Sequence, residues 1–499
     1  MFKSEILVLS AALLMSMALT ACGSKSEFHD TIVGADDAGS TTETTAAVRD
    51  DTAEDTKLHL VNGEHTYTII YDKDMSKNAV SACKELNEHL GGNLTVANDE
   101  KEASFGEYEI LLGATNRPES TEQAEALGMF DYSITIQDEK LVVVGGSEDA
   151  LINAIACLVR GDDLGADGSI ARNYSAYFDG ADNRDEYIAN PDLFLCKWAL
   201  KFDVPQWMND FEEKIAAFAD TDGRMMSCSH RGDSVYYPEN SIEGIISAMK
   251  MGIDIIEIDV HLTSDGVAVL MHDATLTDTT DWKEKAGQNG LPTSDKICDW
   301  TFEQIRQLRL VTKSGAQSDY VIPTLKEALQ VCNERTTLRL DKADEWDWDT
   351  DVYPLVKETG AWRTCIVNEY VSLEKQKEIM DTIKADSGKD ALMFYRYPDF
   401  KSETWVSLTE SLLGQGYQPI GQWVGFDNSG EWYLREYESL LSPIKDDIRM
   451  LAFSHALDGG KEDSKTWDYL YGYGVDIVVA DDALNLQQYI AENYEATEY

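Results

Sequence analysis

The sequence has few basic residues for its length. Only 42 lysines and arginines stand against 91 aspartates and glutamates in 499 residues, which gives a formal charge of −49. Because such a chain repels a polyanion, we do not expect it to bind nucleic acid. An anionic substrate would need a local cation, either a bound divalent metal ion or a few well-placed Arg and Lys side chains. Alternatively, the acidity serves only the solubility of a secreted protein.

Cysteine is scattered, and no C-x-x-C spacing occurs among the eight cysteines. A cysteine zinc site and a dense disulfide framework are therefore not expected. We interpret most of these thiols as small core residues. Apart from Cys22, they are Cys83, Cys157, Cys196, Cys228, Cys298, Cys332 and Cys365.

The apolar run near the N-terminus, which begins at Ile6, holds about sixteen apolar or small residues, fewer than the roughly twenty that span a bilayer. We therefore expect residues 1–22 to be a signal peptide rather than a permanent anchor. Its last residues, LTAC, resemble the bacterial lipobox, which implies cleavage before Cys22 and lipidation of its thiol. An ordinary signal peptide with a stray cysteine is the alternative. Lipid chains would hold the protein at the bacterial cell surface, on the outer face of the membrane.

The composition is that of a globular protein, with 43% hydrophobic and 10% aromatic residues. A chain of this length predicts two or three domains. Residues 23–57 are rich in Ser, Thr, Asp and Glu and should form a disordered tether.

Residues 58–180 alternate strand-like and helix-like segments with short turns, which predicts a small α+β domain. Within it, YSITIQDEKLVVVGG reads as a hairpin and SEDALINAIACLVRG as a helix with a serine cap. Arg117 lies in the turn after a strand, where it could contact an anion, but we interpret it as a structural surface residue and assign no chemistry to it. Residues 181–224 should be a connector that ends in a helix packed on the next domain.

From residue 225 to residue 499, short β runs alternate with helical patterns nearly eight times. Parallel strands require crossover helices, so the economical fold is a TIM-type (β/α)8 barrel preceded by the small α+β domain. An open doubly wound sheet is the second choice.

The segment IDIIEIDV carries two carboxylates at alternate positions. Strand alternation places Glu257 and Asp259 on the inner face, while the aliphatic residues face the helices. Two buried like charges are costly, and a divalent cation such as Mg²⁺ or Ca²⁺ relieves their repulsion. The alternative, an exposed strand edge, fits poorly because the flanking residues are apolar.

The β runs before and after IDIIEIDV both end in histidine, which places the two histidines at the same end of the predicted barrel as the acid pair. MMSCSH ends in His230, followed by Arg231, and VAVLMHD carries His272. Imidazole titrates near neutral pH, so two histidines beside a metal suit a general acid and a general base. Arg231 offers a bidentate fork for phosphate oxygens. In the following PENS, either Asn240 or Ser241 can cap the next helix.

Together these motifs resemble the glycerophosphodiester phosphodiesterase family, a calcium- or magnesium-dependent barrel. The resemblance covers about residues 225–495 and rests on an ordered series of motifs: HRG, PENS, A-x-K-x-G, D-x-x-E-x-D-V, T-x-D-G-V-x-V-x-H-D and IPTL. It implies hydrolysis of a small phosphodiester substrate, with His230 and His272 as the acid/base pair. It also implies Glu257 and Asp259 as metal ligands and Arg231 as a phosphate ligand.

The sequence departs from the family pattern at three places. The third metal ligand is usually a glutamate in E-x-K, whereas LRLDKAD places Asp341 there with Lys342 directly after it. We keep Asp341 as a ligand and Lys342 as a phosphate ligand, provided that the strand has ended and the lysine curls back. Asp278 stands where an arginine is common, and Ala480 precedes Asp481 where Thr-Asp is usual.

Polar residues at the later strand ends should shape the pocket for the alcohol portion. They are Asn368, Arg396, Gln422, Trp423, Ser454, His455 and Asp481. The attacking oxygen is either water or the adjacent glycerol hydroxyl, through a cyclic phosphate. A phospholipase-like activity on lipid headgroups and a non-catalytic binding protein for phosphorylated glycans remain the alternative functions.

Overall fold

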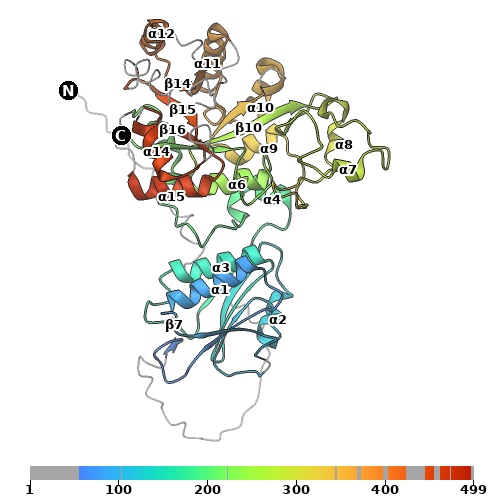
Figure 1. The fold of residues 1–499 in the computed structure, drawn as a ribbon, viewed down its shortest axis with the longest axis vertical. Helices are drawn as coiled ribbons and strands as arrows, with labels where there is room; N and C mark the ends of the chain where they lie inside the picture. Colours follow the sequence, from blue (N-terminus) through green and yellow to red (C-terminus); the bar gives the residue numbers. More distant parts are fainter. Residues whose placement is uncertain are drawn as a thin grey trace, which may run out of the picture. The chain divides into compact units, whose positions relative to one another are not determined.

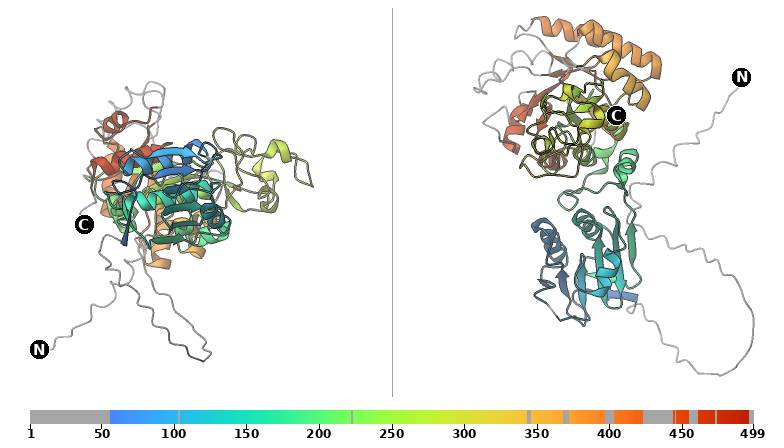
Figure 2. Two further views of the ribbon diagram at one scale, coloured as in Figure 1. Left: turned by 90° about the horizontal axis from the view of Figure 1, so that it is seen from below. Right: turned by 90° about the vertical axis from the view of Figure 1, so that its right-hand side faces the viewer.

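The computed structural model describes residues 56–495, apart from 103, 222, 343–345, 368–371, 397–402, 423–443, 445, 455–460 and 473. The chain divides into two compact units (Figures 1 and 2). The first runs up to Glu186 and includes Asp192–Lys201, and the second holds Tyr187–Pro191 and the chain from Phe202 onward. The domain boundaries given above stay predictions.

The first unit is built on a six-stranded sheet in the order β3-β2-β4-β6-β5-β8, beside a two-stranded pair of β1 and β7. The strands β2, β3, β4 and β6 are parallel, whereas β5 is antiparallel to both β6 and β8. Its strands are β1 (Lys57–His59), β2 (Thr68–Tyr71), β3 (Thr95–Asn98), β4 (Glu109–Leu112), β5 (Tyr132–Gln137), β6 (Lys140–Gly145), β7 (Ser169–Ala171) and β8 (Ser175–Phe178), and its helices are α1 (Lys77–His89), α2 (Pro118–Ala124) and α3 (Glu148–Arg160).

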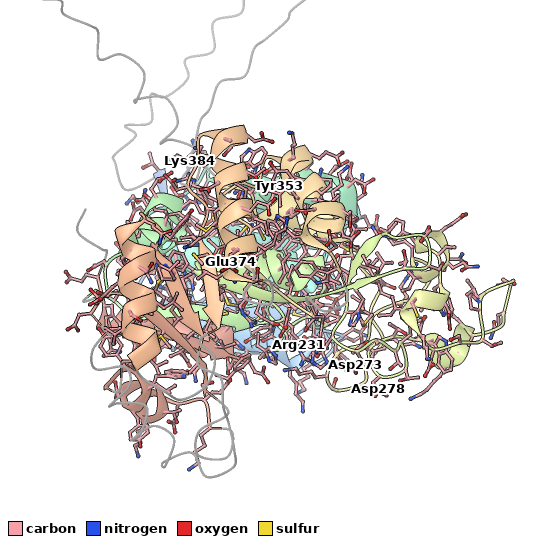
Figure 3. All side chains as sticks on the ribbon, turned by 90° about the horizontal axis from the view of Figure 1, so that it is seen from above. Arg231, Asp273, Asp278, Tyr353, Glu374 and Lys384 are labelled. Carbon is pink, nitrogen blue, oxygen red and sulfur yellow. The ribbon has the colours of Figure 1, made fainter. Side chains whose placement is uncertain are left out.

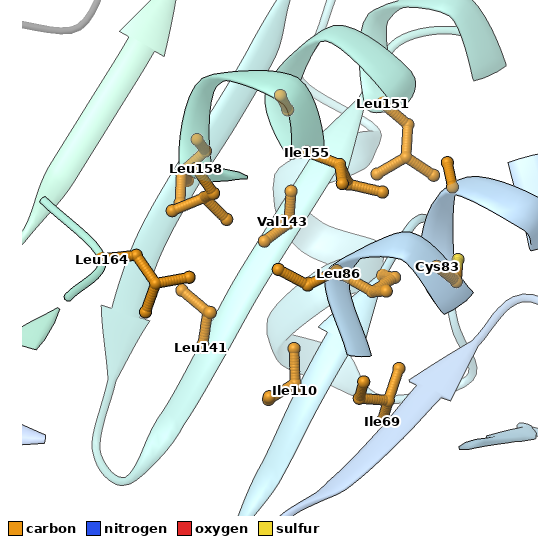
Figure 4. Packing of buried hydrophobic residues seen from close by; sticks show 14 of the residues in the cluster. Ile69, Cys83, Leu86, Ile110, Leu141, Val143, Leu151, Ile155, Leu158 and Leu164 are labelled. Atoms are coloured by element: carbon orange, nitrogen blue, oxygen red, sulfur yellow. The ribbon is translucent and has the colours of Figure 1, made fainter. Parts of the chain in front are cut away.

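Helices α1 and α3 lie side by side on one face of this sheet (Figures 1 and 4). Leu86 of α1 and Ile155 of α3 pack there against Ile110 and Val143 of the strands. The predicted cap is present, because Ser147 Oγ accepts a hydrogen bond from the Ala150 amide at 3.3 Å. The predicted hairpin is the β5–β6 pair, so the predicted mixture of strands and helices in this unit is present.

Arg117 has a structural role, but its predicted place at the surface is wrong. The side chain is entirely buried, and its Nη2 lies 2.7 Å from Glu109 Oε1. Lys140 Nζ lies 3.3 Å from the other carboxylate oxygen of Glu109. The exposed ring of Phe105 also lies against the guanidinium, at 4.9 Å. A guanidinium can be buried only when it is paired, and Glu109 supplies the pairing charge.

The second unit alternates strands and helices in the order that the sequence predicts. Helix α4 (Arg184–Ala189) leads along the chain from the first unit into it. The strands are β9 (Met226–His230), β10 (Ile255–Leu262), β11 (Ala268–Leu270), β12 (Thr337–Asp341), β13 (Met393–Arg396), β14 (Pro419–Gln422), β15 (Arg449–Phe453) and β16 (Ile477–Ala480). The helices are α5 (Phe211–Ala217), α6 (Ile242–Lys250), α7 (Trp282–Lys285), α8 (Phe302–Ile305), α9 (Leu325–Cys332), α10 (Tyr353–Thr359), α11 (Leu373–Ser387), α12 (Glu403–Gly414), α14 (Ser464–Gly472) and α15 (Ala483–Asn493).

The parallel strands of the second unit close into a ring. Strand β9 pairs with β10, β10 with β12, and β13 to β16 pair in sequence order. Single bridges place the segment Cys365–Val367 between β12 and β13. Strand β16 pairs back onto β9, which completes the circle. The TIM-type barrel is therefore confirmed, and an open doubly wound sheet is excluded.

One predicted barrel strand is not part of the ring. VAVLMHD forms β11, which pairs antiparallel with the end of β10 through Val260 and Leu270. Between the two strands the chain turns within residues 263–267, far fewer residues than a parallel crossover requires. The prediction of β11 as a neighbouring barrel strand was wrong, and β12 lies directly beside β10 instead.

The lower part of the barrel interior is filled by apolar side chains. Met226 and Cys228 of β9, Ile255 of β10 and Val479 of β16 belong to one buried cluster. Ala217 of α5 and the next residue, Phe218, join it, so the predicted helix at the end of the connector does pack on the barrel. Because side chains alternate along a strand, each next inward position lies towards the carboxyl end of the barrel.

Residues 274–323, here called the arm, project from one side of the barrel between β11 and α9 (Figures 1 and 2). The arm has a small apolar core of its own, in which Trp300 is fully buried among Leu276, Ile305 and Leu310. The arm is thus a packed part of the second unit rather than an extended loop.

Candidate active site

Three acidic side chains converge at the carboxyl end of the barrel. Glu257 and Asp259 occupy inward positions above Ile255, and the pairing of β10 with β12 places Asp341 directly beside Asp259. One oxygen of each carboxylate lies within 4.8 Å of the others. Glu257 and Asp259 are each 1% exposed. This all-oxygen set fits a hard divalent cation such as Ca²⁺ or Mg²⁺.

The electrostatics of the cluster favour a bound cation. Burial raises the pKa of Glu257 well above its usual range, and the nearby charge of Asp259 raises it further. The buried guanidinium of Arg339 offsets part of this repulsion, since its Nη1 lies 3.8 Å from Glu257 Oε1 and 3.8 Å from Asp341 Oδ2. Sequence reasoning missed Arg339, although its position two residues before Asp341 puts both on one strand face.

His230 ends β9 and lies opposite Glu257 in the pairing of β9 with β10. Its Nδ1 lies 2.6 Å from Asp481 Oδ1. The ring of Phe453 meets the imidazole edge to face, at 5.4 Å and 87°. His230 therefore stands at the rim of the barrel beside the acid cluster, with its ring orientation fixed by two neighbours.

His272 reaches the same rim by a different route from the one predicted. It follows the hairpin strand β11, and its carbonyl oxygen accepts a hydrogen bond from the buried His261, whose Nε2 lies 3.1 Å away. Its Nδ1 lies 2.8 Å from Asp273 Oδ1, and its Nε2 lies 3.4 Å from Lys342 Nζ. Each predicted catalytic histidine thus carries a carboxylate on Nδ1.

Arg231 lies over the acid cluster in a left-handed backbone conformation, with φ of 61°. Its amide donates to Glu257 Oε2 at 3.1 Å. Its Nη1 lies 3.0 Å from both oxygens of Glu239, and its Nε lies 3.6 Å from Asp259 Oδ2. The guanidinium is therefore held at the site by carboxylates, and sequence reasoning did not foresee the part of Glu239. Figure 3 labels Arg231 and Asp273, together with Asp278 of the arm.

Lys342 follows the end of its strand and curls back towards the site, as its predicted role requires. Strand β12 ends at Asp341, and Lys342 turns with φ of 60° while its amide donates to Asp341 Oδ1 at 2.7 Å. Its ammonium group reaches His272. Strand alternation alone would point the Lys342 side chain away from Asp341. The left-handed backbone at Lys342 instead turns this side chain to the inner side of the barrel.

The two cap candidates in PENS have separate tasks. Ser241 Oγ accepts from the Gly244 amide at 3.0 Å and caps α6. Asn240 is turned to the acid cluster, where its Nδ2 donates to Asp259 Oδ2 at 2.9 Å. Asp278, on the arm, is exposed and lies 3.8 Å from Lys283 Nζ.

Two of the polar residues predicted at the later strand ends, Ser454 and Asp481, have side-chain contacts in the described part of the chain. Ser454 Oγ donates to Glu462 Oε1 at 2.9 Å, and Asp481 contacts His230 and Lys313. Asn368, Trp423 and His455 lie outside the described residues, as do the side chains of Arg396 and Gln422.

Among the described cysteines, five free thiols are buried, as expected for core residues, and Cys298 is exposed. Cys22, the signal peptide and nearly all of the tether lie outside the described residues. In the part of the chain that is described, no helix combines the length and apolarity needed to cross a membrane.

The model of the Glycerophosphoryl diester phosphodiesterase family matches residues 230–387. Glycerophosphodiester phosphodiesterase 1 of Homo sapiens is 38% identical over 122 residues, which are 24% of this chain and 34% of the human protein. Glycerophosphodiester phosphodiesterase of Caldanaerobacter subterraneus subsp. tengcongensis is 38% identical over 111 residues, 22% of this chain and 41% of that protein. The chain thus spans less than half the length of these curated relatives.

Two solved structures also align with part of the chain. A glycerophosphoryl diester phosphodiesterase from Parabacteroides distasonis aligns with a TM-score of 0.43 and 21% identity over 58% of this chain and 94% of that chain. An Oleispira antarctica phosphodiesterase, solved with its product sn-glycerol-3-phosphate, aligns with a TM-score of 0.37 and 21% identity over 54% of this chain and 97% of that chain. Residues 230–387 contain both histidines, all three acids, Arg231 and Lys342. This segment of the chain is therefore similar to the Glycerophosphoryl diester phosphodiesterase family.

Proposed function

We propose that this protein hydrolyses glycerophosphodiesters to glycerol phosphate and an alcohol, with one divalent cation, Ca²⁺ or Mg²⁺, as cofactor. The supporting observation is the convergence of three carboxylates within 4.8 Å beside two histidines, inside the region that matches the family model. Its curated relatives carry the name of this activity.

The acid cluster would bind the cation, and the basic residues would bind the phosphate group of the substrate. Glu257, Asp259 and Asp341 would hold the cation, and what a cation supplies at such a site when bound is withdrawal of charge from a phosphoryl oxygen. Arg231 and Lys342 bring positive charge to the same rim and would bind the remaining phosphate oxygens.

The histidines supply proton transfer. His230 and His272 both have Nδ1 on a carboxylate, which leaves Nε2 as the nitrogen that exchanges a proton with the reacting oxygens. One histidine removes a proton from the attacking oxygen, and the other protonates the departing alkoxide. Positioned proton transfer of this kind contributes about 10²- to 10⁴-fold in rate.

A product analysis by ³¹P NMR tests the proposal. The full chain, purified in detergent, is incubated with glycerophosphocholine, glycerophosphoethanolamine and glycerophosphoglycerol, each with Ca²⁺, with Mg²⁺ and with a chelator. We expect glycerol phosphate only where a cation is present. A transient cyclic phosphate signal would identify the glycerol hydroxyl as the attacking group. Phosphatidylcholine in the same assay separates a phospholipase-like activity, and no cleavage of any ester refutes the proposal.

A matched pair of variants separates the metal site from general effects of charge. Glu257→Gln removes a buried carboxylate of the cluster, whereas Glu303→Gln makes the same change at an exposed position on α8. We expect the first variant to lose activity at low cation concentration and the second to match the unchanged protein.

We also propose that the protein is anchored by lipid at the outer face of a bacterial membrane through Cys22. The sequence LTAC at positions 19–22 supports this proposal. Labelling with a radioactive fatty acid in bacteria should mark the unchanged protein and not Cys22→Ser. Equal labelling of the two would refute the anchor.

A further inference from the structure

Asp481 and His230 are 251 residues apart in the chain, yet His230 Nδ1 lies 2.6 Å from Asp481 Oδ1. Strand pairing brings them together, because β16 and β9 are parallel neighbours with Ala480 opposite Ser229. His230 is the last residue of β9, and Asp481 directly follows β16. Asp481 therefore approaches the histidine across the junction where the barrel closes.

The backbone around Asp481 is fixed by Glu462. One oxygen of this carboxylate accepts from the Asp481 amide at 2.7 Å, and the other accepts from the Asp482 amide at 2.6 Å. Ser454, after β15, donates to Glu462 Oε1 as well. Two successive amides that share one carboxylate have little freedom to rotate, so the Asp481 side chain leaves the backbone in a set direction.

The arm supplies the second partner of the Asp481 side chain. Lys313 Nζ lies 3.0 Å from Asp481 Oδ2, and both side chains are about half exposed. The two carboxylate oxygens thus have different partners, His230 on one side and Lys313 on the other. The pKa of Asp481 lies far below its usual range, because the carboxylate accepts a hydrogen bond from His230 and is then further stabilised by Lys313. Asp481 is therefore ionised in this arrangement.

We propose that Asp481 is the positioning residue of His230, and that Glu462 and Lys313 hold Asp481 in place. An ionised carboxylate on Nδ1 keeps the proton on that nitrogen and directs Nε2 to the substrate. The arm then has a share in catalysis, because Lys313 acts on the histidine through Asp481. This inference rests on the proposed function for the meaning of the proton transfer, but the orientation of the ring can be tested without it.

The kinetic test compares two changes at the site with the same two changes at a surface ion pair. The site variants are Asp481→Asn and Lys313→Met. The controls are Asp278→Asn and Lys283→Met, since these two exposed side chains form a 3.8 Å pair on the same arm. In the hydrolysis of a glycerophosphodiester, Asp481→Asn should lower kcat by at least about tenfold, because its amide favours the wrong tautomer. KM should change less than kcat.

Lys313→Met should lower kcat by about two- to fivefold, the effect of an exposed ion pair. In the double variant with Asp481→Asn this loss should disappear, because Lys313 acts only through Asp481. Both control variants should keep the kcat of the unchanged protein. A full additional loss in the double variant, or equal losses in the controls, would overturn the role of Lys313.

The tautomer of His230 gives a readout that needs no substrate. Long-range ¹H–¹⁵N spectra of the ¹⁵N-histidine-labelled full chain should show neutral His230 with its proton on Nδ1, and Asp481→Asn should move the proton towards Nε2. An unchanged tautomer, or an unchanged kcat in Asp481→Asn, overturns the inference. If the unchanged protein hydrolyses no glycerophosphodiester, the proposed function fails, while the spectra still decide the role of Asp481.

Discussion

Asn240 and Asp259 hold each other by two hydrogen bonds. Asn240 Nδ2 donates to Asp259 Oδ2 at 2.9 Å, and the Asp259 amide donates to Asn240 Oδ1 at 3.0 Å. Asn240 has φ of 56°, and the two other site residues with a left-handed backbone are Arg231 and Lys342. A residue other than glycine costs about 1–2 kcal/mol in this conformation. Hydrogen bonds from these three residues to the carboxylates of the acid cluster offset this cost.

Replacing Asn240 with glycine should weaken cation binding without straining the backbone. Glycine accepts the positive φ, so the loss reports the missing hydrogen bonds to Asp259. We expect the affinity for Ca²⁺ or Mg²⁺ to fall by about 10- to 100-fold, as for other residues that orient a metal ligand. Isothermal titration calorimetry measures this directly.

The control for this change is Asn289→Gly, at an exposed arm residue with φ of 50°. It should bind the cation as the unchanged protein does. Unchanged affinity in Asn240→Gly would show that Asp259 needs no support from Asn240.

Replacing Arg339 with methionine should make the stability of the protein depend on the cation. The guanidinium is the buried positive charge beside Glu257 and Asp341. Its loss leaves the acids to repel one another, a cost of about 3–5 kcal/mol or roughly 10 °C in Tm. Differential scanning calorimetry with a chelator should show this loss, and a saturating divalent cation should recover most of it.

Arg449→Met is the matched control, because Arg449 is also fully buried but bonds the carbonyl oxygens of Ala217 and Arg224. It should lower Tm equally with and without the cation. The account of Arg339 is wrong if the cation shifts Tm of both variants by the same amount.

Protonation of Asp233 should raise the free energy of unfolding as the pH falls from neutral to mildly acidic. Burial raises the pKa of Asp233 to about 6, although its carboxylate accepts from Ser247 Oγ at 2.6 Å. The folded state therefore binds this proton more tightly than the unfolded chain, whose aspartate pKa is about 3.9. As pH falls from about 7 to 4, this group adds up to about 3 kcal/mol to the free energy of unfolding.

Asp233→Asn removes this contribution. The variant should gain stability relative to the unchanged protein at pH 7.5 and lose that advantage at pH 4.5, as measured by urea denaturation. Asp319→Asn, at an exposed arm position, serves as the comparison and should show no such change. A stability difference for Asp233→Asn that is the same at both pH values contradicts the raised pKa.

Strand alternation was enough to predict the inward carboxylates of β10. Glu257 and Asp259 alternate with aliphatic residues, and this local pattern survives in the fold. The closeness of Asp341 to Asp259 depended on knowing that β11 leaves the ring, because a strand in that place would separate β10 from β12. The turn between β10 and β11 is too short for a parallel crossover, so the sequence did indicate that β11 leaves the ring.

Other parts of the site have no local signal. Lys313 and Glu462 reach Asp481 from the arm and from the segment before α14, and nothing in their own neighbourhoods in the sequence predicts the contact. Their positions follow from how the arm packs and how the barrel closes. Arg117 shows the same limit in the first unit, because its burial depends on the distant pairing of Lys140 and Glu109 around it.

The most direct test of the account is to follow the release of glycerol phosphate from a glycerophosphodiester by ³¹P NMR. His230→Ala and His272→Ala are compared with the unchanged protein in the presence of Ca²⁺ or Mg²⁺. We predict turnover by the unchanged protein and a loss of at least about 10²-fold in each variant, the contribution of a positioned proton donor or acceptor. Full activity in either variant would contradict the assignment of this rim as the catalytic centre.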